Sequence, residues 1–182
     1  IEYYKGIFTI LSSCASRQLE EVTFRRTVIP VQELLDTAGK YFKKSMKNRS
    51  ERIELEIEPM EAKVIGDVNQ LRFLLENLID EALTVREDGV IRLQARKDNE
   101  YIRFLFTDTR REKSVEELNQ LFYPNLARMT SGEKGELRGT EYLVCKQIIR
   151  DHDEFAGRRG CRINAEPAEG GGFTVYFTIP RR

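Results

Sequence analysis

The hydrophobic and polar positions of residues 67–83 follow the period of an amphipathic helix. Asn77 and Glu81 lie four residues apart beside the apolar stripe, so we expect them on one face of this helix, one turn from each other. Such a polar pair is typical of a helix that lines a ligand pocket. The stripe itself comprises Leu71, Leu74, Leu75, Leu78, Ile79, Ala82 and Leu83.

The segments before this helix predict a leading helix followed by alternating strands and a second helix. Residues 2–20 have an apolar seam that is typical of a helix packing on a partner helix or on a second copy of the chain. Residues 22–29 are strand-like, and Pro30 suits the first turn of a helix. Residues 52–58 alternate between apolar and charged side chains, which predicts a strand with a short partner strand at 62–65.

The segments after the helix predict a hairpin, two helices and a closing pair of strands. Residues 90–96 and 101–107 read as a hairpin, and Ser114 is expected to cap a short helix through a capping box with Glu117. The glycine- and polar-rich stretch 123–138 predicts a loop, from which a helix runs to about residue 152. The last two strands, 161–166 and 173–180, flank a glycine-rich turn.

Composition narrows the class of protein. With 182 residues and 40% hydrophobic content, the chain can bury one core, or a core with an accessory helix. Thirty basic and thirty acidic residues cancel, so no overall field attracts nucleic acid or an anionic membrane. Three scattered cysteines indicate free thiols and a cytoplasmic, reducing compartment. No run approaches the roughly 20 apolar residues of a membrane span.

The absence of an initial methionine leads us to expect that the chain is cut from a longer protein. Whether that longer protein has a membrane segment is left open. The single histidine, His152, lies in a charged stretch at the end of a predicted helix. We interpret it as a surface residue rather than a phospho-acceptor. No nucleophilic triad or metal cluster is visible in the sequence.

From about residue 30 to 180, five segments in order resemble the ATP-binding catalytic domain of sensor histidine kinases, in the GHKL ATPase superfamily. Residues 66–83 look like its N-box and 103–112 like its strand ending in D-x-G-x-G. LFYPN at 121–125 is similar to the F-box. Residues 138–153 resemble the G-x-G-L helix, and 170–180 resemble the terminal G-T-x-F-x-F-x-L-P strand.

The resemblance implies an α+β fold, a two-layer sandwich whose mixed sheet is covered on one face by helices, preceded by one N-terminal helix. It divides the chain into the end of a dimerisation-type helix with its linker, 1–29, and an ATPase-like domain, 30–182. It implies ATP or ADP and Mg²⁺ as cofactors, with Mg²⁺ at Asn77 and Glu81. It also implies six cofactor-binding positions: Asn77, Glu81, Asp108, Gly139, Thr140 and Thr174.

By this resemblance, Asn77 keeps the first N-box asparagine, but Glu81 replaces the second, a magnesium ligand. A carboxylate still suits Mg²⁺, yet it adds a negative charge beside a triphosphate. Asp108 matches the aspartate that accepts a hydrogen bond from the adenine amino group, and Thr174 matches its hydroxyl partner. The adenine-reading pair is therefore expected to be retained.

The family's glycines are largely lost. Arg110 and Glu112 replace both glycines of D-x-G-x-G, and Glu141 replaces the glycine that follows Gly139. Such glycines let backbone N–H groups approach phosphate. We hypothesise that the Glu141 carboxylate occupies the place of a phosphate at its helix start. Binding of phosphate by Arg110 or Arg111 is the alternative.

Plainer interpretations stay open for each of these residues. Asn77 and Glu81 suit the solvated edge of a helix, and Asp108 suits a cap of the turn that follows it. Thr174 suits an ordinary strand position, and Gly139 suits a helix start.

The sequence predicts a degenerate, histidine-kinase-like domain of a two-component signalling protein, with weak or absent ATP turnover and a regulatory or partner-binding role. Its expected partners are a second copy of the chain, bound through the N-terminal helix, and a response regulator or kinase. The alternative is an active catalytic domain that phosphorylates a histidine outside this chain. A stand-alone GHKL ATPase or serine kinase fits less well, because residues 1–29 look like the tail of a dimerisation hairpin.

Overall fold

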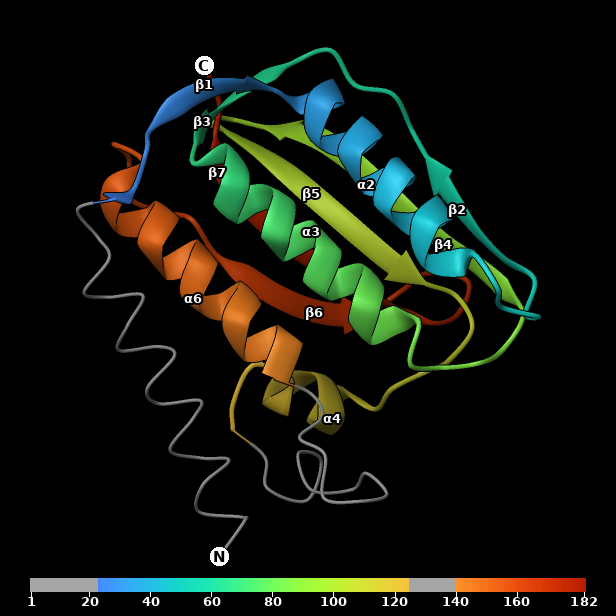
Figure 1. The fold of residues 1–182 in the computed structure, drawn as a ribbon. Helices are drawn as coiled ribbons and strands as arrows, with labels where there is room; N and C mark the ends of the chain where they lie inside the picture. Colours follow the sequence, from blue (N-terminus) through green and yellow to red (C-terminus); the bar gives the residue numbers. More distant parts are fainter. Residues whose placement is uncertain (1–22, 125–139) are drawn as a thin grey trace, which may run out of the picture.

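The computed structural model describes residues 23–124 and 140–182 (Figure 1). The leading helix expected at 2–20 lies outside these residues, as do Gly139 and most of the loop expected at 123–138. None of the described helices has the length and apolar content needed to cross a bilayer. The elements are β1 (Thr27–Pro30), α2 (Val31–Met46), β2 (Ile53–Ile57), β3 (Lys63–Gly66), α3 (Val68–Ala82), β4 (Gly89–Asp98), β5 (Tyr101–Asp108), α4 (Val115–Gln120), α6 (Thr140–Phe155), β6 (Ile163–Pro167) and β7 (Phe173–Pro180).

The main sheet is mixed and has five strands in the order β2-β4-β5-β7-β6. β2 and β4 run parallel, while the β4–β5, β5–β7 and β6–β7 pairs are antiparallel. The short strand expected beside residues 52–58 pairs elsewhere: β3 forms a separate two-stranded antiparallel sheet with β1. The expectation of a β2 partner there was wrong, because β4, from the distant hairpin, takes that edge.

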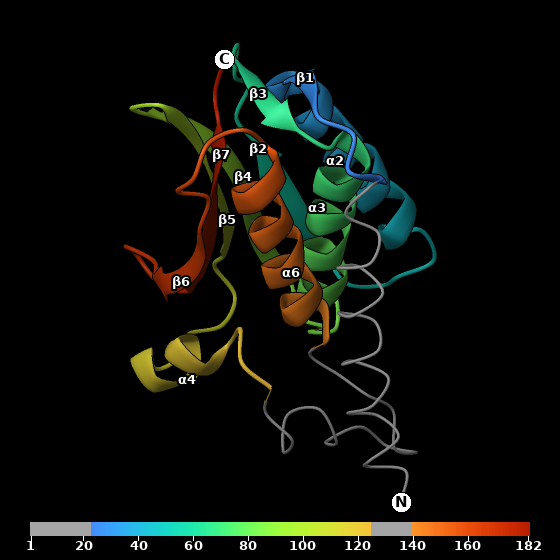
Figure 2. The same ribbon diagram turned by 90° about the vertical axis from the view of Figure 1, so that its left-hand side faces the viewer.

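Helices α2, α3 and α6 lie across one face of the main sheet, and the two views show the two layers (Figures 1 and 2). Side chains of β5 alternate, so that Ile102, Phe104 and Phe106 are buried under the helices. Phe104 stacks on Phe177 of β7, with ring centroids 4.8 Å apart. This is the α+β, two-layer arrangement that the sequence predicted.

The helix predicted at 67–83 is α3, and its apolar stripe is buried as expected. Asp67 begins the helix, because its carboxylate accepts hydrogen bonds from the backbone N–H groups of Asn69 and Gln70. The capping box of Ser114 and Glu117 is also confirmed. The β4–β5 hairpin turns at Asn99, which has a φ of 54°.

His152 is fully buried, so its interpretation as a surface residue was wrong. Its Nε2 accepts a hydrogen bond from the backbone N–H of Asp67 at 3.1 Å, and its Nδ1 lies 2.8 Å from the carbonyl of Ile148. Its ring meets Phe24 edge to face. The charged neighbours in the sequence misled the interpretation, because the end of α6 passes directly over the start of α3.

Candidate functional site

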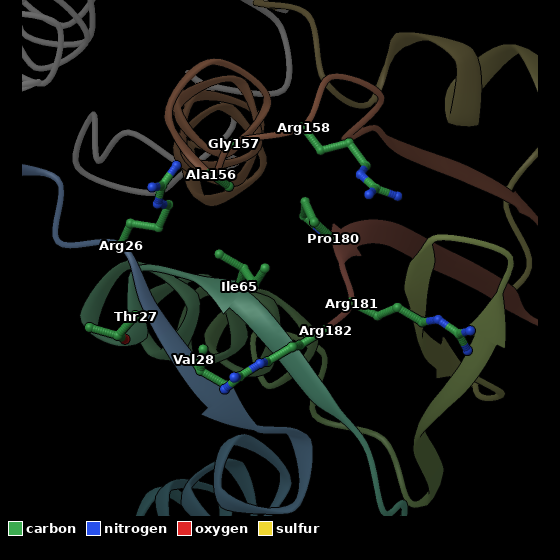
Figure 3. Close-up of a pocket in the computed structure, with 10 residues that line it drawn as sticks. All are labelled: Arg26, Thr27, Val28, Ile65, Ala156, Gly157, Arg158, Pro180, Arg181 and Arg182. Carbon is green, nitrogen blue, oxygen red and sulfur yellow. The ribbon is translucent and has the colours of Figure 1, made fainter.

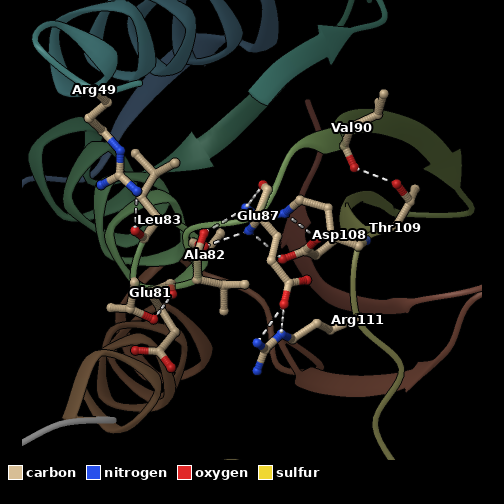
Figure 4. A network of polar contacts seen from close by, with 12 residues as sticks. Arg49, Glu81, Ala82, Leu83, Glu87, Val90, Asp108, Thr109 and Arg111 are labelled. Atoms are coloured by element: carbon tan, nitrogen blue, oxygen red, sulfur yellow. Dashed lines mark hydrogen bonds and ion pairs between the residues drawn. The ribbon is translucent and has the colours of Figure 1, made fainter. Parts of the chain in front are cut away.

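The candidate site lies where α3 ends, at the last residue of β5 and the turn after it (Figure 4). β5 carries the Asp108 carboxylate to the helix-covered face, where it is 5% exposed. The connection between α3 and β4 passes beside it, and its backbone carbonyls point towards the same space.

The Arg110 side chain fills this space. Its Nε and Nη2 donate to the two carboxylate oxygens of Asp108, each at 2.9 Å. Its Nη1 donates to the carbonyls of Val85 and Glu87 at 2.8 and 3.0 Å, and its Nη2 donates to the carbonyl of Ala82 at 2.5 Å. A guanidinium has five N–H groups, and all five are therefore satisfied.

The ion pair is buried, with side-chain exposures of 1% for Arg110 and 6% for Asp108. Asp108 also accepts a hydrogen bond from the backbone N–H of Arg110 at 3.0 Å, so it caps the turn as the plainer interpretation proposed. Arg110 packs over Gly89, where a Cβ would lie 2.5 Å from its Cγ. Since Gly89 has a φ of +146°, the chain turns here in a way that leaves room for the arginine.

Arg111 points away from the buried site and pairs with Glu87 at 2.6 Å. The hydrogen bond from Arg111 lowers the pKa of Glu87, and the same bond raises the pKa of Arg111. Both side chains are about half exposed. Arg110 stands at the first glycine position of D-x-G-x-G, and Arg111 follows it. The guanidinium of each is engaged by a carboxylate, Asp108 for Arg110 and Glu87 for Arg111.

Asn77 and Glu81 lie on one face of α3, one turn apart, as the spacing predicted. Asn77 is 7% exposed and donates its amide to the carbonyl of Phe73, one turn back in the same helix. Glu81 is partly exposed and lies near the end of the helix, where Figure 4 shows it close to Ala82 and Leu83. The structure therefore places Glu81 next to Ala82, whose carbonyl accepts from Arg110, and Asn77 one turn earlier in α3.

Thr174 and Asp108 are not brought together. Asp108 pairs in register with Phe173, whereas Thr174 pairs with Thr107 and shares a hydroxyl hydrogen bond of 2.7 Å with it. Successive side chains on a strand point to opposite faces. Thr174 therefore faces the side of the sheet away from the helices, and Phe173 faces the side of Asp108.

At the start of α6, Thr140 and Glu141 form the first turn of the helix, while Gly139 lies outside the described residues. The Oε2 atom of Glu141 is buried and accepts no hydrogen bond from a described residue. An anion in the first turn of a helix is favourable. The carboxylate thus lies in the turn where the family resemblance expects a phosphate to approach.

Arg110 takes the contacts at Asp108 that the resemblance assigns to a nucleotide. The carboxylate expected to accept from adenine already accepts three hydrogen bonds from Arg110, and the arginine side chain occupies the space beside it. Among residues 23–124 and 140–182, no three His, Cys, Asp or Glu side chains cluster in a way that could hold a metal ion.

Sequence reasoning missed the role of Arg110. It identified the lost glycine and the capping role of Asp108, but it treated the arginine as a candidate phosphate ligand. The available signal was the close spacing of an aspartate and an arginine two residues later, which allows a local ion pair across a turn. The three carbonyls that complete the arginine's contacts come from a distant segment, and spacing could not reveal them.

Comparisons with known proteins point to one family. Residues 66–182 match the family described as "Histidine kinase-, DNA gyrase B-, and HSP90-like ATPase". No curated protein matches the chain.

Among solved structures, the nucleotide-free catalytic domain of histidine kinase ThkA is similar at a TM-score of 0.66 and 20% identity, over 86% of this chain and 97% of that one. The mycobacterial sensor histidine kinase MprB is similar at 0.66 and 19%, over 87% and 99%. The Acinetobacter baumannii histidine kinase AdeS is similar at 0.66 and 16%, over 95% and 74%. These likenesses show the fold.

Proposed function

Because the chain belongs to the family of histidine kinase-, DNA gyrase B- and HSP90-like ATPases, we propose that it is the histidine-kinase-like domain of a two-component signalling protein with a degenerate nucleotide site. Such a domain turns ATP over weakly or not at all. It acts by binding and regulating partner proteins, and its scaffold is that of a catalytic domain.

The observation that carries this proposal is the buried ion pair between Arg110 and Asp108. For adenine to reach Asp108, the arginine has to leave three hydrogen bonds to carbonyls and two to the carboxylate. Hydrogen bonds to charged groups each contribute about 1.5–3 kcal/mol. A nucleotide would have to offset that loss before gaining any affinity of its own.

Two carboxylates on the phosphate side support the same proposal. Glu81 replaces an amide near the end of α3, and Glu141 lies in the first turn of α6 with a buried Oε2 atom. Each places negative charge where a triphosphate would bring more. At 4 Å and an effective dielectric near 20, two like charges repel by about 4 kcal/mol.

The test is a titration of ATP and ADP, with and without Mg²⁺, followed by calorimetry and by thermal shift. We expect no saturable Mg²⁺-dependent binding in the micromolar range. Low micromolar or tighter Mg²⁺-dependent affinity would contradict the proposal. A sharper form of the test restores the family's glycines in one variant, Arg110→Gly with Glu112→Gly and Glu141→Gly.

In that variant the proposal expects Mg²⁺-dependent nucleotide binding to appear or to strengthen at least tenfold. Arg111→Gly is the matched control, because it removes the neighbouring, half-exposed arginine and leaves the Arg110 side chain in place beside Asp108. A circular dichroism spectrum confirms that each variant is folded. Equal affinity in the restored variant, the control and the original chain would count against the assignment of Arg110 as the obstacle.

The second candidate function is an active catalytic domain that phosphorylates a histidine outside this chain. The retained, buried Asn77 of α3 favours it. The same titration separates the two candidates, and transfer of radiolabelled phosphate from ATP to a separate histidine-bearing domain would establish the active one.

We also propose that residues 1–29 form the end of a dimerisation helix with its linker, and that residues 30–182 form the ATPase-like domain. Histidine kinase ThkA has been solved in complex with response regulator protein TrrA. By analogy, a response regulator or a kinase is the proposed partner. Light scattering should give a dimer with residues 1–29 present and a monomer without them; a monomer in both cases would refute the dimerisation role.

A cytoplasmic location completes the proposal. Cys145 and Cys161 are buried and form no disulfide bond with each other, as expected for thiols in a reducing compartment.

A further inference from the structure

An arginine-lined cavity of about 380 Å³ opens at the other end of the domain, between β1, β3 and the end of β7 (Figure 3). We call it the arginine pocket. Its floor is apolar, and no Asp or Glu lies among its lining residues. Four of these are arginines: Arg26, Arg158, Arg181 and Arg182.

The four arginines come from three parts of the chain. Arg26 precedes β1, Arg158 follows α6, and Arg181 and Arg182 follow β7. In Figure 3, Arg26 lies beside Ala156 and Gly157 at one side, and Arg182 extends across β3 from the other. The fold therefore gathers charge that the neutral overall composition hides.

Backbone hydrogen bonds fix the main chain at Arg181 and Arg182. The N–H of Arg181 donates to the carbonyl of Glu100 and the N–H of Arg182 to the carbonyl of Lys63, each at 3.0 Å. On the opposite side, the Nη1 of Arg26 lies 2.8 Å from the place where a Cβ on Gly157 would sit. Gly157 has a φ of +95°, so a glycine provides both the turn and the room for this guanidinium.

The charges of the pocket are only partly neutralised within the domain. Glu100 pairs with Arg158, and this hydrogen bond, with a smaller contribution from Arg181, lowers the pKa of Glu100. Within residues 23–124 and 140–182, Arg26, Arg181 and Arg182 form no ion pair. Within residues 23–124 and 140–182, Arg158 is thus the one arginine of the four with a carboxylate partner, and Arg26 and Arg182 approach the cavity from opposite sides.

We propose that the arginine pocket binds a ligand carrying phosphoryl groups, held by Arg26 and Arg182. Guanidinium groups bind phosphate through two parallel N–H···O bonds, and arginines on two sides suit an anion with more than one charged group. The cavity volume lies within the range of small-ligand sites. The apolar floor of Val28, Ile65 and Pro180 leaves these guanidinium groups as its principal polar contacts.

Calorimetric titration of the whole chain with inorganic pyrophosphate tests the proposal, at low and at physiological ionic strength. We expect saturable binding that Arg26→Gln and Arg182→Gln each weaken about tenfold, as the loss of one charge-assisted contact implies. Arg86→Gln is the matched control. Arg86 is 68% exposed, pairs with Glu51 and lies outside the residues that line the pocket. In the control, the Kd should stay within about twofold.

A second arm identifies the source of the phosphoryl group. Vesicles of phosphatidylcholine, with or without phosphatidic acid, are sedimented with each protein. Retention on the phosphatidic acid vesicles that is lost in the Arg26 and Arg182 variants assigns the site to a lipid headgroup. Pyrophosphate binding without vesicle retention assigns it to a soluble ligand. Absence of both, or an equal loss with Arg86→Gln, overturns the proposal.

The pocket and the nucleotide site can be told apart with the same proteins. ATP also carries phosphoryl groups, so a weak, Mg²⁺-independent signal that disappears in the Arg26→Gln, Arg182→Gln double variant belongs to the arginine pocket. A Mg²⁺-dependent signal that persists in the double variant would instead contradict the proposed degeneracy of the nucleotide site. Each proposal can thus fail alone.

Discussion

The guanidinium of Arg110 and the carboxylate of Asp108 meet at 2.9 Å inside the domain, two residues apart in sequence and nearly sealed from solvent. The pair joins the end of β5 to the backbone after α3, because Arg110 also binds the carbonyls of Ala82, Val85 and Glu87. Arg110 therefore binds, within the domain, a carboxylate and three carbonyls that would otherwise be open to a ligand.

Loss of the carboxylate should destabilise the domain strongly. Asp108→Asn leaves the buried guanidinium without its counter-charge, and breaking a buried pair costs about 3–5 kcal/mol. Urea unfolding, followed by circular dichroism, measures this change in the free energy of unfolding. Glu87→Gln is the control: it breaks the exposed pair with Arg111 and should cost less than about 1 kcal/mol. Equal costs in the two variants would show that Arg110 is not held as described.

The elements of this fold were predictable where the signal is local. The stripe of α3, the capping box at Ser114 and the β4–β5 hairpin each depend on residues a few positions apart, and each is confirmed. Register and contacts between distant segments were not predictable. β3 pairs with β1 across more than thirty residues of chain, and no pattern within either strand names its partner.

The candidate site was likewise predictable only where the signal is local. Asn77 and Glu81 were placed correctly on α3, because helical spacing fixes their common face. The relation of Asp108 to Thr174 depends on the register of β5 with β7, which sets Phe173 opposite Asp108. The engagement of Arg110 depends on carbonyls more than twenty residues away. Those two facts required the three-dimensional structure.

Glu141 should limit whatever affinity for nucleotide remains. Removing its carboxylate relieves repulsion at the start of α6, so Glu141→Ala and Glu141→Gly should both raise residual ATP affinity, by about three- to tenfold. The two variants separate two causes. A gain with glycine alone would assign the effect to backbone freedom, and no gain with either would show that the carboxylate points elsewhere. Thermal shift with ATP at increasing concentration measures both.

The buried side chain of His152 should contribute strongly to the stability of the described domain. His152→Ala removes a buried ring and leaves the N–H of Asp67 without its acceptor, so we expect a loss of about 2–4 kcal/mol in the free energy of unfolding. Arg150→Ala, an exposed position on the same helix, should change stability by less than about 0.5 kcal/mol. A mild effect of His152→Ala, similar to that of the control, would contradict the buried hydrogen bond.

The two described cysteines should resist thiol reagents until the domain unfolds. Burial, with the nearby charge of Asp153, raises the pKa of Cys161 to about 12, and Cys145 is fully buried. The thiolate is the reactive form, so at pH 8 Cys161 should react far more slowly than a free cysteine. In a Cys14→Ser background, Ellman's reagent should detect both thiols quickly in denaturant and slowly in buffer.

The Cys161 thiol should make the stability of the domain depend on pH, with a definite sign. The pKa of Cys161 in the folded state lies above its unfolded value of 9.0, so the neutral thiol favours folding. Its contribution to stability is complete below pH 9 and is lost as the pH rises from about 9 towards 12. Cys161→Ser replaces the thiol by a hydroxyl that does not titrate in this range. If unfolding midpoints of the two proteins fell in parallel between pH 9 and 11, Cys161 would not be the group responsible.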